Sequence, residues 1–299
     1  MPNYIMNARD WGKLVLISIV WGLSFFFIEI ALRELGFFTL VFYRIGSAAV
    51  IVTMILYIRG GRLPFDLSSW RKFFTLGLFN NFIPFSLITW GQVQIDSGLA
   101  SILTATTPLF AVVMAHFMTR DEHMTRNRIV GVLLGVVGVC LLVGPEALHG
   151  LSSHAMGQIA VLGSAVSYSY GSIYTRELNK IPLIEAMAGT LIAAFILATP
   201  AMLLFEYPLQ TSMQWTTIGA VLAMAVFGTV FAYMLYFNAV RTFGATNTML
   251  VTFLVPITAL LMGVAVLGES LSQYALLGML VIFAGLLAVD GRVFRKLRA

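Results

Sequence analysis

Ten long apolar runs, separated by short polar segments, dominate the 299-residue chain. Each run is close to the roughly 20 apolar residues that a helix needs to cross a hydrocarbon core about 30 Å thick. Only 10% of the residues are charged, whereas soluble globular chains average about 25%. The sequence therefore predicts an all-helical integral membrane protein, and it excludes a soluble enzyme.

The runs predict ten transmembrane helices. Strands of a membrane barrel alternate apolar and polar residues over about ten positions, and continuous apolar runs favour helices instead. The expected spans are residues 12–31, 38–58, 73–94, 98–118, 128–145, 156–175, 184–205, 215–240, 245–266 and 273–290.

Lysine and arginine predict the orientation. With the N-terminus inside, 16 of the 18 basic residues fall in cytoplasmic segments, while Arg33 lies on the other side and Arg44 within a span. Cationic segments resist translocation, so both termini are expected in the cytoplasm, across a bacterial-type inner membrane. Because the basic residues belong to loops beside the lipid bilayer, the net charge of +5 does not indicate a nucleic-acid partner.

One pattern of residues occurs twice, 148 residues apart. The first copy contains Thr104, Thr107, Pro108 and Ala111, and the second contains Thr252, Val255, Pro256 and Ala259. Each copy is followed by an acidic connector and a glycine-rich span, with Gly131 and Gly138 in the first and Gly278 and Gly285 in the second. Chance similarity between apolar helices is the alternative to a true repeat.

The repeat predicts two five-helix units, residues 1–148 and 149–299. Because each unit has an odd number of spans, the second is expected upside-down relative to the first. This is the inverted-repeat plan of secondary transporters, which bind substrate near the midplane and expose it alternately to the two sides.

These residues carry a family resemblance. The carrying residues are Trp21, Gly22, Ser24, Tyr43, Arg44, Ala48, Pro108, Gly131, Gly138, Pro256, Gly268, Glu269, Gly278 and Gly285. Over nearly its whole length the chain resembles the ten-helix EamA type of the drug/metabolite transporter superfamily. The resemblance implies a ten-helix bundle with a central cavity, alternating access and export of small metabolites. The leading comparison is with the YddG-type exporters of aromatic and other neutral amino acids. The first unit departs from the pattern, because Arg120-Asp121-Glu122 stands where the second has Gly268-Glu269.

The two prolines are candidate hinges. Pro108 and Pro256 lie near the centres of the fourth and ninth spans, where each removes one helical hydrogen bond and clashes with the carbonyl four residues earlier. Those carbonyls belong to Thr104 and Thr252. We expect a symmetric pair of hinges beside the substrate cavity; a passive kink that improves packing is the alternative.

The third span is unusually polar. At spacings of three and four, Asn81, Phe85, Ile88 and Gln92 share one helix face. This face is interpreted as a cavity wall. Hydrogen bonding between helices is the alternative, since buried amides also bond across helices for about 0.6 kcal/mol on average.

Aromatic residues complete the predicted cavity. Trp21, Tyr168 and Tyr233 lie too deep for the interfacial belt and suit a cavity that stacks a planar or apolar group; ordinary packing is the alternative. The predicted substrate-binding residues are Trp21, Asn81, Phe85, Trp90, Thr107, Tyr168, Tyr233 and Asn247.

Arg44 lies about seven residues inside the second span, where an unpaired arginine at the bilayer centre costs roughly 2.5–3.5 kcal/mol. Glu29, near the outer end of the first span, is its expected partner in a structural ion pair. An arginine that extends outward to the interface, or one that contacts an anion or gates the pathway, are the alternatives.

The sequence places no Asp, Glu, His or Lys near the centre of a predicted span. A proton-driven antiporter of the small multidrug type needs a deep carboxylate, and carriers of sugar phosphates or nucleotide sugars need several basic residues facing the cavity. The sequence therefore favours a neutral, zwitterionic or aromatic solute. Amino acids, aromatic ones included, are the leading prediction.

Other classes fit less well. Intramembrane proteolysis needs a deep histidine, but His116 lies near a span end, and the chain has no phosphate-binding G-x-x-x-x-G-K-[ST] loop. We expect no cofactor and no metal site. A channel or lipid translocator on the same fold remains an alternative. The glycine face of residues 131–138 indicates close packing within one chain, so a monomer is expected, with a dimer seam as the alternative.

Overall fold

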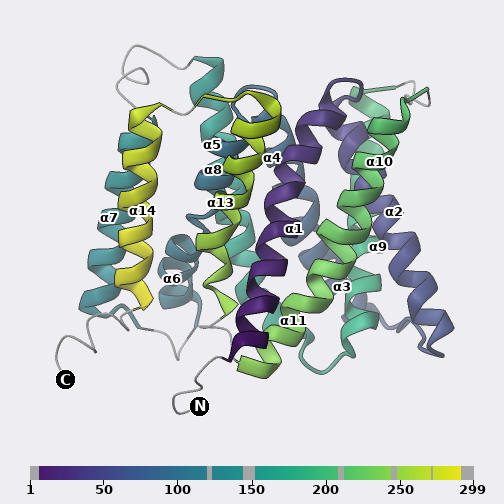
Figure 1. Ribbon diagram of the computed structural model, residues 1–299. Helices are drawn as coiled ribbons and strands as arrows, with labels where there is room; N and C mark the ends of the chain where they lie inside the picture. Colours follow the sequence, from purple (N-terminus) through teal and green to yellow (C-terminus); the bar gives the residue numbers. More distant parts are fainter. Residues whose placement is uncertain are drawn as a thin grey trace.

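The computed structural model describes residues 7–119, 123–143, 152–207, 212–243, 248–270 and 272–290. The regular structure within these ranges is entirely helical (Figure 1). The first half contains α1 (Ala8–Leu32), α2 (Phe37–Ile58), α3 (Leu67–Gly77), η1 (Leu78–Phe82), α4 (Ile83–Gln92), α5 (Ser97–Thr104), α6 (Thr107–Met118) and α7 (Arg126–Val143). The second half contains α8 (Ser153–Tyr174), η3 (Thr175–Leu178), α9 (Leu183–Phe205), α10 (Trp215–Ala223), η4 (Met224–Phe231), α11 (Ala232–Phe243), α13 (Val251–Met262), η5 (Gly263–Leu267) and α14 (Gln273–Asp290).

Each of the ten predicted apolar ranges is largely helical in this structure. Among the described residues, seven helices are long and apolar enough to cross a membrane, and two shorter apolar helices cover Val251–Leu267 and Gln273–Val289. The π-helical segments η1 and η4 interrupt two of the predicted spans, and residues 105–106 divide a third into α5 and α6.

The helices run alternately between two ends of the bundle. We call the end where α1 begins and α14 ends the near end, at the bottom of Figure 1, and the opposite end the far end. Among the described residues, every lysine and arginine except Arg33 and Arg44 belongs to a near-end segment. The basic residues therefore gather on one side, as the sequence predicts.

Helices α7 and α14 lie side by side at one edge of the bundle (Figure 1). A Cβ added to Gly138 would lie 2.9 Å from the carbonyl oxygen of Gly278, and a Cβ added to Gly278 would lie 2.7 Å from that of Gly138. Gly131 and Gly285 face each other in the same way. The glycines that match in the two copies of the repeat therefore form the contact between two helices of one chain.

The two halves pack against each other in a reciprocal pattern. Helix α1 packs on α13 and α10, while its counterpart in the second half, α8, packs on α5, α6 and α4. Similarly, α3 packs on α9, and α2 packs on η4 and α9. Exchanging the two halves converts most of these contacts into one another.

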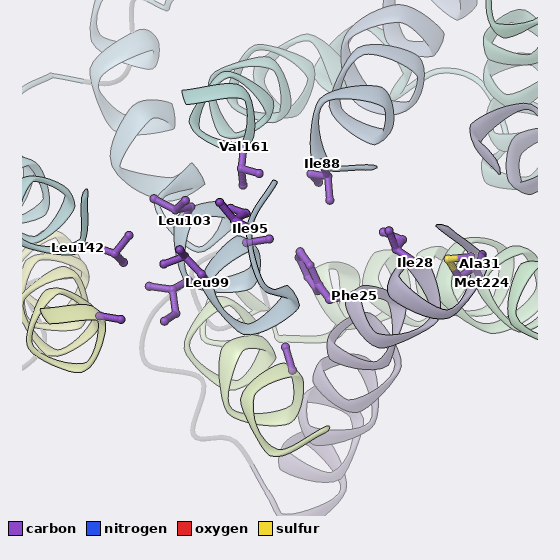
Figure 2. Packing of buried hydrophobic residues seen from close by; sticks show 14 of the residues in the cluster. Phe25, Ile28, Ala31, Ile88, Ile95, Leu99, Leu103, Leu142, Val161 and Met224 are labelled. Carbon is purple, nitrogen blue, oxygen red and sulfur yellow. The ribbon is translucent and has the colours of Figure 1, made fainter. Parts of the chain in front are cut away.

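An apolar cluster lies in the far half of the bundle. Phe25 of α1 lies in the middle of a cluster to which Ile88 of α4, Leu99 of α5 and Val161 of α8 contribute (Figure 2). All four side chains are buried. This cluster closes the interior toward the far end.

Carboxylates also join the two halves at the far end. Glu206, directly after α9, accepts hydrogen bonds from the amides of Phe38 (3.1 Å) and Thr39 (2.7 Å) in the first turn of α2. Glu34, after α1, accepts one from the amide of Gln214, which precedes α10 (3.0 Å). A carboxylate at a helix N-terminus satisfies free amides and is favoured by the helix dipole.

Glu269 makes the third such contact. Its carboxylate accepts hydrogen bonds from the amides of Ser97 (2.9 Å) and Gly98 (3.0 Å), which begin α5. It follows Gly268, which has a left-handed φ of 73° that glycine adopts without strain. The Gly268-Glu269 turn therefore ends η5 and caps a helix of the other half. The matching residues of the first unit, Arg120 to Glu122, lie outside the described residues.

The two prolines do not form the symmetric pair that the sequence predicts. Pro108 lies in the first turn of α6, after a break at residues 105–106, whereas Pro256 lies within the continuous helix α13. A proline in a first helical turn costs no helical hydrogen bond, because that amide has no partner there. The Thr104 carbonyl is not left free, since it accepts a hydrogen bond from the Thr107 hydroxyl at 2.7 Å. A hinge role for these positions stays a prediction.

The close approach of α7 and α14 predicts that Gly138→Ala destabilises the protein. The new methyl group would meet backbone atoms of α14, and overpacking of this kind costs about 1–3 kcal/mol. Thermal unfolding of the purified protein in detergent should show a lower Tm. Gly219→Ala in α10 is the matched control, because nothing lies within 4 Å of its added Cβ. Equal Tm values for the two variants would contradict the contact.

The carboxylate caps predict that Glu269→Ala lowers the free energy of unfolding by about 1–2 kcal/mol, since two helical amides lose their acceptor. Glu177→Ala provides the control. The Glu177 side chain is exposed and pairs with Lys72 at 3.8 Å, and exposed pairs contribute about 0–1 kcal/mol. Thermal unfolding of both variants measures the difference, and a loss for Glu177→Ala as large as for Glu269→Ala would refute the cap.

Candidate functional site

Arg44 points into the bundle from α2. Its side chain is buried, with 7% of the residue exposed. The Nε group donates a hydrogen bond to the Thr229 hydroxyl at 3.4 Å, and the Cζ atom lies 3.9 Å from the centre of the Phe85 ring. Arg44 therefore does not extend outward to the membrane interface; its cation lies on an aromatic face inside the protein.

The predicted ion pair between Glu29 and Arg44 is wrong. Among the described residues no carboxylate lies within 4.0 Å of Arg44, whereas Lys72 and Glu177 form an ion pair at the near end. The reason is depth. Glu29 lies about 4.5 Å from the far end of α1, whereas Arg44 lies about 10 Å into α2, at 1.5 Å per residue. The Arg44 side chain then extends further inward to Thr229.

The neighbours of Glu29 are other far-end charges. Its carboxylate interacts electrostatically with Glu269, Arg33 and Asp96. Asp96 lies between α4 and α5, and burial together with the nearby Glu269 raises its pKa. The far-end acids therefore form a group of their own, separate from Arg44.

Asn81 and Tyr233 connect the two halves beside Arg44. The Tyr233 hydroxyl donates a hydrogen bond to Asn81 Oδ1 at 3.2 Å. Asn81 is fully buried, and its Nδ2 has no hydrogen-bond partner. Tyr168 and Tyr233 are the electrostatic neighbours of the guanidinium. We call this group the Arg44 cluster: Arg44, Asn81 and Phe85 from the first half, and Tyr168, Thr229 and Tyr233 from the second.

Two π-helical segments present the cluster. Asn81 lies in η1 and Thr229 in η4, where the Thr229 hydroxyl donates to the Met224 carbonyl five residues earlier, at 3.0 Å. Such segments are rare within α-helices and are frequent at functional sites. The residue spacing of the repeat connects them, because Thr229 and Tyr233 follow Asn81 and Phe85 by 148 residues.

The sequence analysis missed Thr229, which stands alone in an apolar run. The 148-residue offset of the repeat, applied to Asn81, points to it. The glycine before it is a second signal. A Cβ on Gly228 would lie 2.5 Å from the Ser24 hydroxyl and 3.9 Å from Arg44 Nη2, so glycine allows α1 and Arg44 to approach this turn.

The other predicted binding residues lie apart from the cluster. Trp21 packs on Tyr236, with ring centroids 5.4 Å apart, in a separate apolar cluster with Leu14 and Ile17. Trp90 follows Phe85 by five residues, which turns it about 140° to another face of α4. Asn247 lies outside the described residues.

Thr107 and Gln92 each take part in a hydrogen bond between two helices. The Thr107 carbonyl accepts a hydrogen bond from the Ser169 hydroxyl of α8 at 2.8 Å. Gln92 Nε2 donates to the Phe25 carbonyl of α1 at 2.9 Å. Of the predicted polar face, Asn81 and Phe85 thus reach the Arg44 cluster, whereas Gln92 bonds two helices, as the alternative interpretation holds.

A cavity of about 430 Å³ lies at the near end, between α2, α9 and α11. Its lining includes Leu56, Arg59, Pro182, Met234 and Arg241. Met234 follows Tyr233 of the Arg44 cluster directly along the chain. None of the predicted binding residues lines this cavity, so the predicted central cavity is not the space found here.

The family model that this chain matches, and two of its relatives, are named as transporters. The model of the "EamA-like transporter family" matches twice, over residues 12–144 and 155–289. The uncharacterized transporter YoaV of Bacillus subtilis is 22% identical over 91% of this chain and 94% of its own length. The uncharacterized inner membrane transporter YedA of Escherichia coli K12 is 24% identical over 94% and 91%. A solved crystal structure with 18% identity has a TM-score of 0.66 and covers 96% of this chain and 97% of its own, which supports the fold alone.

The bond between Asn81 and Tyr233 predicts that Tyr233→Phe destabilises the protein. The change removes one hydrogen bond between helices, which in membrane proteins contributes about 0.6 kcal/mol on average and at most about 1.7 kcal/mol. Tyr236→Phe, three residues along the same helix, is the control, because Tyr236 packs by its ring against Trp21. Thermal unfolding should separate the two variants; a larger loss in Tyr236→Phe would count against the bond.

Proposed function

Because the chain belongs to the EamA-like transporter family, and is thus an integral membrane transporter rather than an enzyme, we propose that it is a secondary transporter of small neutral metabolites. Amino acids, aromatic ones included, are the proposed substrates, exported by alternating access. The observation that carries this proposal is the Arg44 cluster, a buried polar group built from both halves of the chain.

The proposed architecture is ten membrane spans in two inverted five-helix repeats, residues 1–148 and 149–299. Three observations support it: the family model matches the chain twice, the packing of the halves is reciprocal, and π-helical segments recur at the repeat offset. A two-fold relation of this kind lets each half take the conformation of the other, which is how inverted repeats alternate access.

We assign the near end to the cytoplasm of a bacterial-type inner membrane. The concentration of lysine and arginine at that end supports this orientation, and the similar protein of E. coli is named as an inner membrane transporter. In this orientation the near-end cavity is a cytoplasmic vestibule, while the carboxylate caps and the cluster around Phe25 close the outer side. The structure then corresponds to a state closed to the outside.

Uptake of labelled phenylalanine into sealed proteoliposomes tests the proposal, with threonine as competitor and with or without a pH gradient. We expect saturable uptake that threonine inhibits and that protein-free liposomes lack. Independence of the gradient would fit a facilitator, in keeping with spans that lack a central Asp, Glu, His or Lys in the sequence. Absence of uptake for every neutral amino acid would overturn the substrate class, and a non-saturable ion current or lipid scrambling would point to a channel or lipid translocator.

Neighbouring asparagines provide matched variants. Asn81→Ala should raise the half-saturating phenylalanine concentration about 10-fold, because a buried amide of the cluster is lost. Asn80→Ala is the control, since Asn80 packs against Gly171 of α8 instead. Equal effects of the two changes on uptake, at equal protein levels, would remove the cluster from the proposed substrate site.

A further inference from the structure

We propose that Arg44 binds a carboxylate of the transported solute, so that a carboxylate is the group a substrate must carry and an amine is not. The inference rests on the proposed function and specifies the substrate at the same site. It follows from three features: the buried charge of Arg44, the hydrogen-bond donors of the cluster that have no acceptor, and the position of the guanidinium between the two halves.

Among the described residues, the charge of Arg44 has no counterpart within ion-pair distance. A buried ion is normally paired, because removal from water costs several kcal/mol even after the protein relaxes. Arginine cannot avoid this cost by deprotonation. Its contacts here are the Phe85 ring and the Thr229 hydroxyl, and neither carries a formal negative charge. A membrane-embedded charge that no described carboxylate pairs indicates that a ligand supplies the negative charge.

The unused nitrogen groups of the cluster are donors, and the Tyr168 hydroxyl can also donate. The Nη1 and Nη2 groups of Arg44 donate to no described residue, and Asn81 Nδ2 has no partner. By contrast, the Asn81 carbonyl oxygen already accepts from Tyr233. The cluster contains no Asp or Glu that could receive an ammonium group. A site with free donors and a fixed positive charge fits an acceptor anion, and a guanidinium fork matches a carboxylate with two parallel bonds.

The guanidinium is held in place before a ligand arrives. Phe85 covers one face of its plane and Thr229 holds Nε, which leaves the edge with the two Nη groups for binding. Such preorganisation reduces the cost of ordering the side chain on binding.

The cluster also joins the two halves. Arg44 and Asn81 come from the first half, whereas Tyr168, Thr229 and Tyr233 come from the second. A carboxylate on Arg44 therefore sits at the junction that has to rearrange during alternating access. Its binding and release would change the charge balance there with each cycle.

Ligand analogues of the unmodified protein provide the first test. Thermal stabilisation in detergent and competition for phenylalanine uptake are measured with 3-phenylpropionate, which lacks the amine, and phenethylamine, which lacks the carboxylate. We expect 3-phenylpropionate to act within about 10-fold of phenylalanine and phenethylamine to be about 100-fold weaker or inactive. Phenethylamine as potent as phenylalanine would overturn the inference. Stabilisation by chloride equal to that by 3-phenylpropionate would also overturn it, in favour of a simple anion site.

Variants provide the second test. Arg44→Lys keeps the charge but loses the fork, and Arg44→Gln loses both, so we expect the half-saturating concentration to rise about 10-fold and about 100-fold or more. Arg33→Gln is the matched control, an exposed arginine at the far end that should leave uptake unchanged. Normal uptake by a folded Arg44→Gln protein would refute the proposal; where that variant does not fold, the analogue series decides.

The two proposals fail in different ways. Transport of amino acids together with equal competition by phenethylamine would refute the role of Arg44 and keep the proposed function. Stabilisation by 3-phenylpropionate, lost in Arg44→Lys and retained in Arg33→Gln, without transport of any amino acid would keep Arg44 as a carboxylate site and refute the amino-acid substrates.

Discussion

A membrane supplies little apolar driving force for helix association, because lipid tails are as apolar as the side chains they would replace. The two halves of this protein therefore depend on contacts that lipid cannot offer. The backbones of α7 and α14 come into close contact where their glycines face each other. At the far end, carboxylates accept hydrogen bonds from amides of the opposite half. The bond from Tyr233 to Asn81 belongs to the same class of interaction. Each lies at one defined place and so specifies the packing of the halves seen in this structure.

These contacts are unequally distributed along the bundle. The far end holds the carboxylate caps and the apolar cluster around Phe25. The near end has the Lys72–Glu177 pair, smaller apolar clusters around Leu14 and Phe73, and a cavity of about 430 Å³. Under the proposed inverted repeat, related contacts could close either end, so the closed end would identify the conformation rather than the fold. Opening the far end requires the Glu206 and Glu269 caps to separate, which exposes helix amides that water can then satisfy.

The sequence predicts the helical ranges and the glycine contact well, because apolarity and close packing are properties of a residue and its near neighbours. Helical spacing correctly places Asn81 and Phe85 on one helix face. Tyr168 and Tyr233 join the same cluster, and their role as a cavity lining stays a prediction. The pairing of Glu29 with Arg44 is wrong because it depends on the depth of two helices, which apolar runs do not fix to within one turn. Trp90 is predicted to bind substrate but lies on a different face of α4 from Phe85. Trp21 packs against Tyr236 instead of reaching the cluster. Polarity does not single out Thr229, because it is one threonine in an apolar run; the 148-residue offset of the repeat from Asn81 does.

The cluster is asymmetric because the two copies of the repeat differ at the position of Arg44. Asn81 and Phe85 correspond to Thr229 and Tyr233 at the 148-residue offset, and both pairs lie on or next to a π-helical segment, yet the position matching Arg44 is Ile192. A symmetric site would hold two buried guanidinium groups, whose repulsion in a low dielectric would oppose the closed packing. With one arginine, the first half contributes the charge and the aromatic face, and the second contributes hydroxyl groups. Under the proposed mechanism, the frame would keep the two-fold relation needed to interconvert conformations, while divergence at a few positions would give the site the single charge that one carboxylate neutralises.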